Sequence, residues 1–141
     1  MKLLSAAVAV AALTLSSVPD ADAQTMVNVS YATDAKAYRK DGAKHLYARY
    51  KDQIFKGKLP PLVHAIVVVE TELDATGNVR SVNMIRVPTH APDVTERVRN
   101  MIQQASPMPA PTRLGGTRYF EVWLVDKSGR FQLDTLTEGQ L

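Results

Sequence analysis

The side chains that could take part in chemistry are few and widely spaced along the chain. The chain contains no cysteine, which excludes thiol chemistry, disulfides and a lipid-bearing cysteine. Its three histidines, His45, His64 and His90, do not show the close His-x-x-x-His spacing of a metal site. We therefore predict structural or surface roles for the histidines, and no metal or other cofactor.

Two carboxylates are the remaining candidates for acid and base chemistry. Glu70 and Glu72 are two residues apart in an extended segment, so their side chains lie on one face of a strand. Such a pair can act as general acid and general base in a hydrolase, but it is more often the solvated end of a strand. The sequence has no nucleophile-elbow, phosphate-loop or dinucleotide-binding glycine motif. We predict that the protein is not an enzyme and keep a hydrolase using these two carboxylates as a third hypothesis.

Positive charge is concentrated in residues 34–58. This segment holds eight lysines and arginines against three aspartates, whereas the whole chain has a formal net charge of +3. One interpretation is a solvated helix whose tyrosines pack inward. The alternative is a soluble periplasmic accessory that binds an anionic ligand or polymer through its first helix. The candidate residues for that alternative are Lys40, Lys44, Arg49 and Lys51.

The N-terminus has the pattern of an export signal. Met1-Lys2 is followed by a mostly apolar run, Leu3 to Leu15, and then by Ala21-Asp22-Ala23, which matches an A-x-A cleavage site. This run is shorter than the roughly 20 residues that cross a bilayer. We predict a signal peptide over residues 1–23, cleavage after Ala23, a periplasmic location, no transmembrane span and no nucleic-acid partner. An uncleaved anchor is the alternative.

The elements that must position these residues fit one domain. The chain has 141 residues and 45% hydrophobic content, which allows a single core. Residues 24–41 lack a clear period and are predicted to be flexible. The alternative is that Asp34 to Asp41 extend the following helix, which Gly42 disfavours. Apolar spacing then predicts helices and strands in the order helix, hairpin, helix, strand, short strand. Their predicted bounds are Ala43–Phe55, Val63–Leu73 with Val79–Val87, Pro92–Ser106, Arg118–Val125 and Arg130–Leu136.

The fold class follows from this order. We predict an α+β domain over residues 42–136, with two helices packed on a small three- or four-stranded antiparallel sheet, and a polar tail over residues 137–141. The proline run Pro107 to Pro111 is predicted to form an extended connection to the third strand.

Three stretches of sequence occur in an order shared with a known family. They are the strand-turn-strand segment Val67–Val79, the segment Ala105–Pro111 with its Pro-x-Pro, and Tyr119–Val122 in the next strand. In this order and spacing the chain resembles the periplasmic C-terminal domains of the TonB and TolA envelope proteins, over about Ala43 to Leu133. The resemblance implies a non-enzymatic protein-binding module that serves cell-envelope transport or integrity.

Two departures limit what the resemblance implies. Energy-transducing members have an N-terminal transmembrane anchor and a long linker, whereas here a predicted cleavable signal and residues 24–41 precede the domain. The chain also lacks the Tyr-Pro start of many TonB-like domains and has Leu59-Pro60-Pro61 after its first helix instead. Partner binding is therefore the function that the resemblance implies, and the resemblance does not extend to coupling with an inner-membrane motor.

The third strand is the predicted binding site, because a small open sheet leaves an edge that can accept a strand from a partner. The site residues are Arg118, Tyr119, Phe120, Glu121, Val122 and Trp123. Tyr119 and Trp123 either form an exposed anchor or are covered by another segment. A proline at Val122 is predicted to weaken binding more than alanine, since it removes a backbone donor. The partner is an envelope protein of unspecified identity, and the same edge would allow a strand-swapped homodimer.

Overall fold

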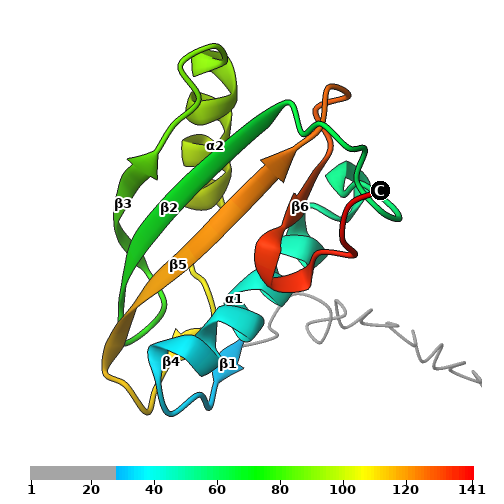
Figure 1. The fold of residues 1–141 in the computed structure, drawn as a ribbon. Helices are drawn as coiled ribbons and strands as arrows, with labels where there is room; N and C mark the ends of the chain where they lie inside the picture. Colours follow the sequence, from blue (N-terminus) through cyan, green and yellow to red (C-terminus); the bar gives the residue numbers. More distant parts are fainter. Residues whose placement is uncertain (1–27) are drawn as a thin grey trace, which may run out of the picture.

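Two helices cover one face of a small sheet in the computed structural model, which describes residues 28–141 (Figure 1). The sheet has four antiparallel strands in the order β3-β2-β5-β6. The strands are β2 (Ala65–Asp74), β3 (Val79–Arg86), β5 (Gly116–Val125) and β6 (Phe131–Leu133), and the helices are α1 (Ala35–Arg49) and α2 (Pro92–Gln104). The predicted α+β class is confirmed. The predicted signal peptide lies outside the described residues.

The remaining elements are short. A parallel pair of strands, β1 (Val29–Ser30) and β4 (Ala110–Pro111), forms a second small sheet. Two 3-10 helices, η2 (Lys51–Gln53) and η3 (Asp134–Leu136), follow α1 and β6. Within residues 28–141, no helix combines the length and the apolar character that a membrane crossing requires.

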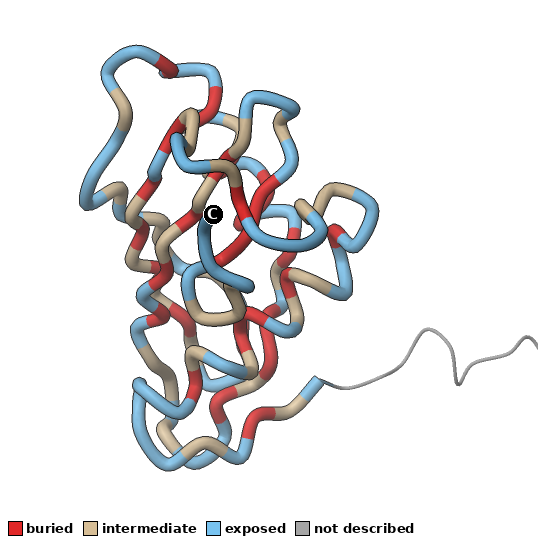
Figure 2. Tube along the Cα trace, turned by 45° about the vertical axis from the view of Figure 1, so that its right-hand side comes forward, coloured by how far each residue is buried: buried red, intermediate tan, exposed pale blue. Residues whose placement is uncertain are grey.

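The hairpin of β2 and β3 forms as predicted. Alternate residues of β2 are buried under the helices, because successive side chains of a strand point to opposite faces. The buried residues of β2 are Ala65, Val67, Val69, Thr71 and Leu73, one of the two faces that its alternation separates. On α2 the apolar stripe expected from its helical period is buried and consists of Val94, Val98, Met101, Ile102 and Ala105. These apolar faces form the core between the sheet and the helices, as the buried segments in Figure 2 show.

The first helix differs from its prediction. It begins at Ala35 rather than Ala43 and ends at Arg49 rather than near Phe55. Asp34 caps its N-terminus, since its side chain accepts a hydrogen bond from the Ala37 amide at 2.7 Å. Gly42 lies in the middle of the helix, where a Cβ would come within 2.9 Å of the Tyr119 ring. The glycine is therefore explained by close packing and does not mark a break.

The segment predicted to be flexible is ordered from residue 28 onward. Val29 and Ser30 pair with Ala110 and Pro111, and the side chain of Tyr38 is fully buried. The packed unit therefore begins well before residue 42. At the other end, the tail over residues 137–141 also packs on the domain, because the Leu141 amide donates to the carbonyl of Leu59 at 2.9 Å.

The turn between β2 and β3 is tied to the proline run. Gly77 has φ +87, a conformation that costs residues with a Cβ free energy. Its carbonyl accepts a hydrogen bond from the Met108 amide at 2.8 Å. A Cβ on Gly77 would lie 2.0 Å from the Met108 carbonyl oxygen. The turn therefore holds the connection between α2 and β4 by direct backbone contact.

Candidate partner-binding site

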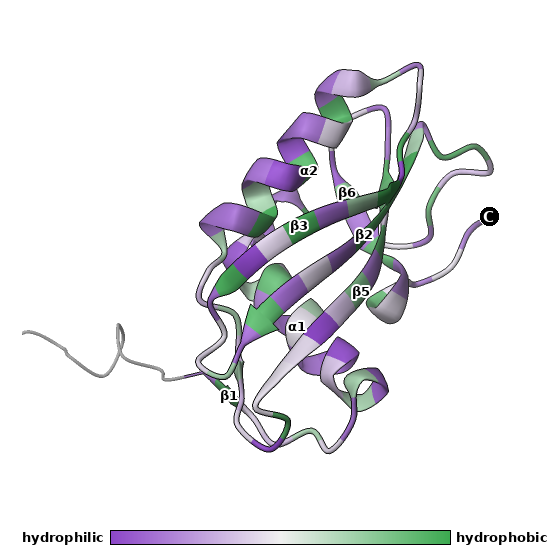
Figure 3. Ribbon diagram, turned by 90° about the vertical axis from the view of Figure 1, so that its left-hand side faces the viewer, coloured by the Kyte–Doolittle hydropathy of each residue, from purple (hydrophilic) through white to green (hydrophobic). Residues whose placement is uncertain are grey.

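The predicted site strand, β5, is not an edge strand over its whole length, because it has neighbouring strands on both sides for part of it. It pairs with β2 from Gly116 to Val125. On its other side, β6 pairs only with Trp123–Val125. The expectation that Arg118–Trp123 forms one continuous free edge is therefore wrong at Trp123. Short as it is, β6 leaves the N-terminal part of β5 without a neighbouring strand on that side (Figures 1 and 3).

Backbone direction identifies which residues of β5 face this unpaired side. Residues of an antiparallel strand direct their backbone groups alternately toward the two neighbours. In the turn to β6 the Asp126 amide donates to the Arg130 carbonyl, and the register of β5 with β2 has no shift. Val122, Phe120 and Arg118, which lie an even number of residues before Asp126, therefore direct N–H and C=O outward.

Two of these three residues have outward backbone groups that form no hydrogen bond. The Val122 amide donates to the carboxylate of Glu121 at 3.1 Å. Among residues 28–141, no hydrogen bond reaches the outward groups of Arg118 and Phe120. We call the outward side of Arg118–Phe120 the open edge. A proline at Val122 would break the bond to Glu121, so Phe120 is the better position for the backbone test.

The two faces of β5 differ in exposure. Tyr119 and Trp123 point toward the helices and are buried, with 2% and 0% exposure. They are core residues, which excludes an exposed anchor made of this pair. Phe120 points to the opposite, uncovered face and is 39% exposed. The aromatic side chain that a partner can touch at the open edge is therefore that of Phe120.

Glu121 is a buried carboxylate beside the open edge. It is only 1% exposed. It accepts hydrogen bonds from the Tyr119 hydroxyl at 2.6 Å, from the Val122 amide, and from the Thr135 hydroxyl at 2.8 Å and amide at 3.3 Å. These bonds compensate for the cost of burying a charge. Because Thr135 belongs to η3, the carboxylate fixes η3 against β5 and limits the open edge at Val122.

The sequence contained one signal for this network. Glu121 alternates with Tyr119 and Trp123, so a charged residue had to share a buried face. A buried charge requires partners. Thr135 could not be identified as one of them, because it comes from a 3-10 helix after the last strand.

Three tyrosines around this network have raised pKa values. Burial is the main cause for Tyr38, Tyr47 and Tyr119. The negative charge of Asp41 raises the pKa of Tyr38 further, and the charge of Glu121 raises that of Tyr119. The hydroxyl of Tyr38 donates to the Pro109 carbonyl at 2.7 Å. All three side chains therefore stay protonated in the folded protein above the pH at which they ionise in an unfolded chain.

We expect stability to fall as the pH rises above about 10, the pKa of tyrosine in an unfolded chain. The unfolded state loses these protons first. Each such tyrosine therefore lowers the free energy of unfolding by up to about 1.4 kcal/mol for every pH unit above 10. Urea unfolding from pH 8 upward measures this slope. Tyr38→Phe and Tyr119→Phe should each flatten it, and an unchanged slope in both variants would contradict the assignment.

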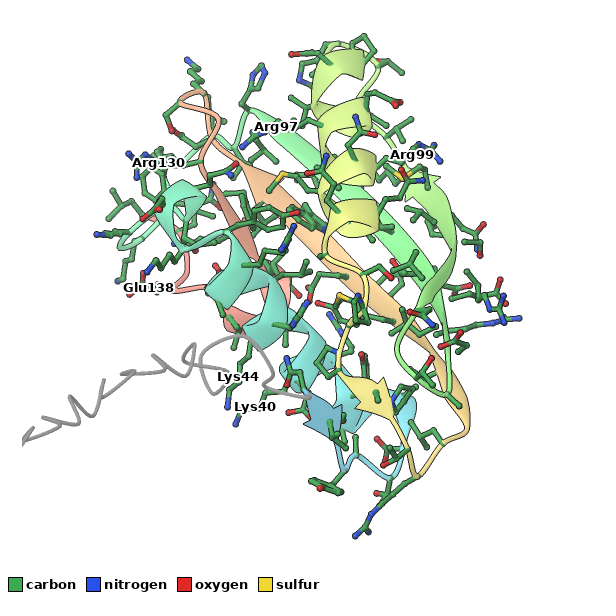
Figure 4. The ribbon with its side chains drawn as sticks, turned by 180° about the vertical axis from the view of Figure 1, so that it is seen from behind. Lys40, Lys44, Arg97, Arg99, Arg130 and Glu138 are labelled. Carbon is green, nitrogen blue, oxygen red and sulfur yellow. The ribbon has the colours of Figure 1, made fainter. Side chains whose placement is uncertain are left out.

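The other border of the sheet, β3, is covered in part by side chains. In β3 the outward backbone groups include the Val79 amide and the Val82 carbonyl. Ser106 Oγ accepts from the Val79 amide at 3.1 Å, and Arg99 of α2 reaches the Val82 carbonyl at 3.4 Å (Figure 4). Two register shifts also interrupt its pairing with β2. Bulges and covering charges of this kind protect an edge from adding strands.

The carboxylates considered for catalysis lie on the uncovered face of the sheet. Arg118 is 3.9 Å from Glu70 and 3.8 Å from Glu72 in ion pairs. Ser81 donates a hydrogen bond to Glu72 at 2.7 Å. The two carboxylates thus share one arginine, an arrangement that ties β5 to β2 across the face.

The residues of the basic alternative lie on the surface of α1 and η2. Lys40, Lys44, Arg49 and Lys51 are exposed, and Lys40 and Lys44 project from α1 on one side (Figure 4). No ion pair involves these four residues within residues 28–141. The Arg49 guanidinium lies 5.7 Å from the centre of the Tyr50 ring.

The histidines do not converge on one point. His45 contacts the Asn28 amide and the Ala105 carbonyl, both at 2.9 Å. His64 and His90 pack edge to face, 5.4 Å apart. Among residues 28–141, no group of three or more histidine or carboxylate side chains could hold a metal ion.

The fold and this site together define a small α+β domain whose sheet has one covered border and one partly open border. Comparison with known protein families, with curated proteins and with solved structures finds no match in any of the three. Functional inference therefore depends on the geometry of the domain itself.

Proposed function

We propose that this protein is a non-enzymatic periplasmic interaction module that binds an envelope protein by β-strand addition at the open edge. The observation that carries the proposal is the pair of outward-facing, unbonded backbone segments at Arg118 and Phe120. Backbone hydrogen bonds would supply most of the affinity, and side-chain contacts would select the partner. The exposed ring of Phe120 provides one such contact.

The contrast between the two borders supports this choice. In β3, Ser106 and Arg99 bond the Val79 amide and the Val82 carbonyl, whereas no group within residues 28–141 bonds the outward backbone groups of Arg118 and Phe120. An unprotected edge in a sheet is an aggregation hazard unless it is used. The order of helix, hairpin, helix and strand also agrees with the TonB and TolA resemblance, from which we propose a role in cell-envelope transport or integrity.

Phe120→Pro is expected to weaken partner capture about tenfold, the effect of losing roughly one net backbone hydrogen bond. The Phe120 amide points away from β2, so the substitution leaves the β2 ladder intact. The measurement is a pull-down from envelope extract, quantified by titrating the protein.

The matched control for this experiment is Phe120→Val, which removes the ring but keeps the amide. Capture should be retained to a greater extent in this variant. Equal losses in the two variants, with both folded by circular dichroism, would count against strand addition and would leave only a role for the side chain.

A second candidate function is binding of an anionic ligand or polymer by the basic surface of α1. It is favoured by the exposed lysines at positions 40 and 44, which lack ion-pair partners within the described residues. Such binding should decrease steeply with salt, because exposed charges are screened. Capture that is lost in high salt and in a Lys40→Gln, Lys44→Gln variant, but kept in Phe120→Pro, would favour this function.

A further inference from the structure

Arg39 is a partly buried guanidinium without a hydrogen bond. Its side chain is 30% exposed and is placed by α1 next to β5. Its Nε atom is buried and has no partner, and no other hydrogen bond from Arg39 is formed within residues 28–141. A guanidinium has five donors, and buried donors are almost always bonded. Only Nε is out of reach of solvent, so the rest of the guanidinium, which no residue of 28–141 accepts a hydrogen bond from, is accessible to an acceptor from another molecule.

Glu121 does not fill this role. The closest approach of Arg39 to the Glu121 carboxylate is 3.7 Å, which is an ion-pair contact longer than a hydrogen bond. The carboxylate oxygens are already occupied by donors from Tyr119, Val122 and Thr135. The guanidinium carbon lies 5.5 Å from the centre of the Phe120 ring. This cation–π contact places the guanidinium beside the open edge.

The position of Arg39 relative to an added strand follows from the pleat. Tyr119 and Glu121 point to the helix face of β5. A residue of the added strand opposite either of them would also point to that face. It would then lie on the side where α1 carries Arg39. Lys36, one turn before Arg39, and Lys40, the residue after it, are exposed and form no ion pair within the described chain.

We propose that Arg39 is a carboxylate subsite of the open edge, so that the partner's added strand carries an aspartate or glutamate on the helix face. The proposal rests on the proposed function, since it needs an added strand. A carboxylate accepts two parallel hydrogen bonds from one guanidinium, which gives both affinity and register. The neighbouring lysines add a positive field that favours an acidic segment.

The test is selection of displayed random eight-residue peptides on the purified protein. The wild type should enrich extended sequences without proline that share an acidic residue at one position. Arg39→Gln should lose the acidic preference, and binding of a selected peptide should fall about tenfold, the loss of one charge-assisted pair. Lys56→Gln, a matched loss of one exposed positive charge outside the open edge and the basic surface of α1, should keep the preference.

Each result of the selection has a distinct meaning. Enriched peptides without an acidic position, or an acidic preference that persists in Arg39→Gln, would overturn the subsite and leave strand addition intact. If the wild type enriches no peptide at all, strand addition itself fails, and the subsite fails with it. Thermal unfolding of Arg39→Gln shows whether the variant is folded.

A second measurement separates recognition from a purely structural role of Arg39. A selected peptide and its Glu→Gln version are titrated into the wild type and into Arg39→Gln. The peptide change should weaken binding to the wild type about tenfold and leave binding to the variant nearly unchanged. Equal effects of the peptide change in both proteins would show that Arg39 only supports Glu121.

Discussion

Gly77→Ala is expected to destabilise the protein by about 2 to 4 kcal/mol. The positive φ of this residue costs a side chain about 1 to 3 kcal/mol. The added Cβ would lie 2.0 Å from the Met108 carbonyl oxygen, so the proline run has to move. That movement puts the hydrogen bond between the Met108 amide and the Gly77 carbonyl at risk, a loss of about 1 kcal/mol. Urea denaturation measures the change.

Gly57→Ala is the matched control for this prediction. Gly57 has φ +83, almost the same as Gly77, but no atom lies within 4 Å of its Cβ position. It should therefore show the conformational cost alone, about 1 to 2 kcal/mol. If the two variants lose the same stability, the contact with Met108 contributes nothing and the explanation of Gly77 is wrong.

Glu121→Leu is expected to cost about 3 to 5 kcal/mol, the range seen when one partner of a buried charged network is removed. Leucine has a similar size, but it leaves the Tyr119 hydroxyl and the amides of Val122 and Thr135 without their acceptor. Each unsatisfied buried group adds to the cost. Urea denaturation reports the loss, and faster amide hydrogen exchange over residues 134–136 should show that η3 is released.

Two further variants should lose less stability than Glu121→Leu. Thr135→Val removes only the hydroxyl donor and should cost about 1 kcal/mol. Glu121→Gln keeps one acceptor oxygen and should fall between Thr135→Val and Glu121→Leu. A small effect in all three variants would mean that Glu121 is dispensable for packing η3 on β5.

Most of the fold followed from periodicity. The two-residue period identified β2 as a strand and separated its two faces, and the helical period of α2 identified its buried stripe. The first helix was misplaced because Gly42 is a poor helix former. Its packing against the Tyr119 ring overrides that preference, and a contact of 77 residues in sequence separation leaves no local signal.

The site was predicted only in part. Strand β5 was identified correctly, but the sequence could not show that β6 would cover Trp123 and leave Phe120 free. That division depends on where η3 turns the chain away, and the turn is fixed by Glu121 and Thr135. Arg39 was missed for the same reason, since its relation to β5 is purely tertiary.

The unequal borders of the sheet also limit how copies of this chain can associate. Two copies that meet at their open edges about a two-fold axis use both accepting borders and form a closed pair. Head-to-tail growth would need β3 as the second accepting border, where Ser106 and Arg99 bond the Val79 amide and the Val82 carbonyl. Closed pairing at the two open edges is therefore favoured over head-to-tail growth through β3.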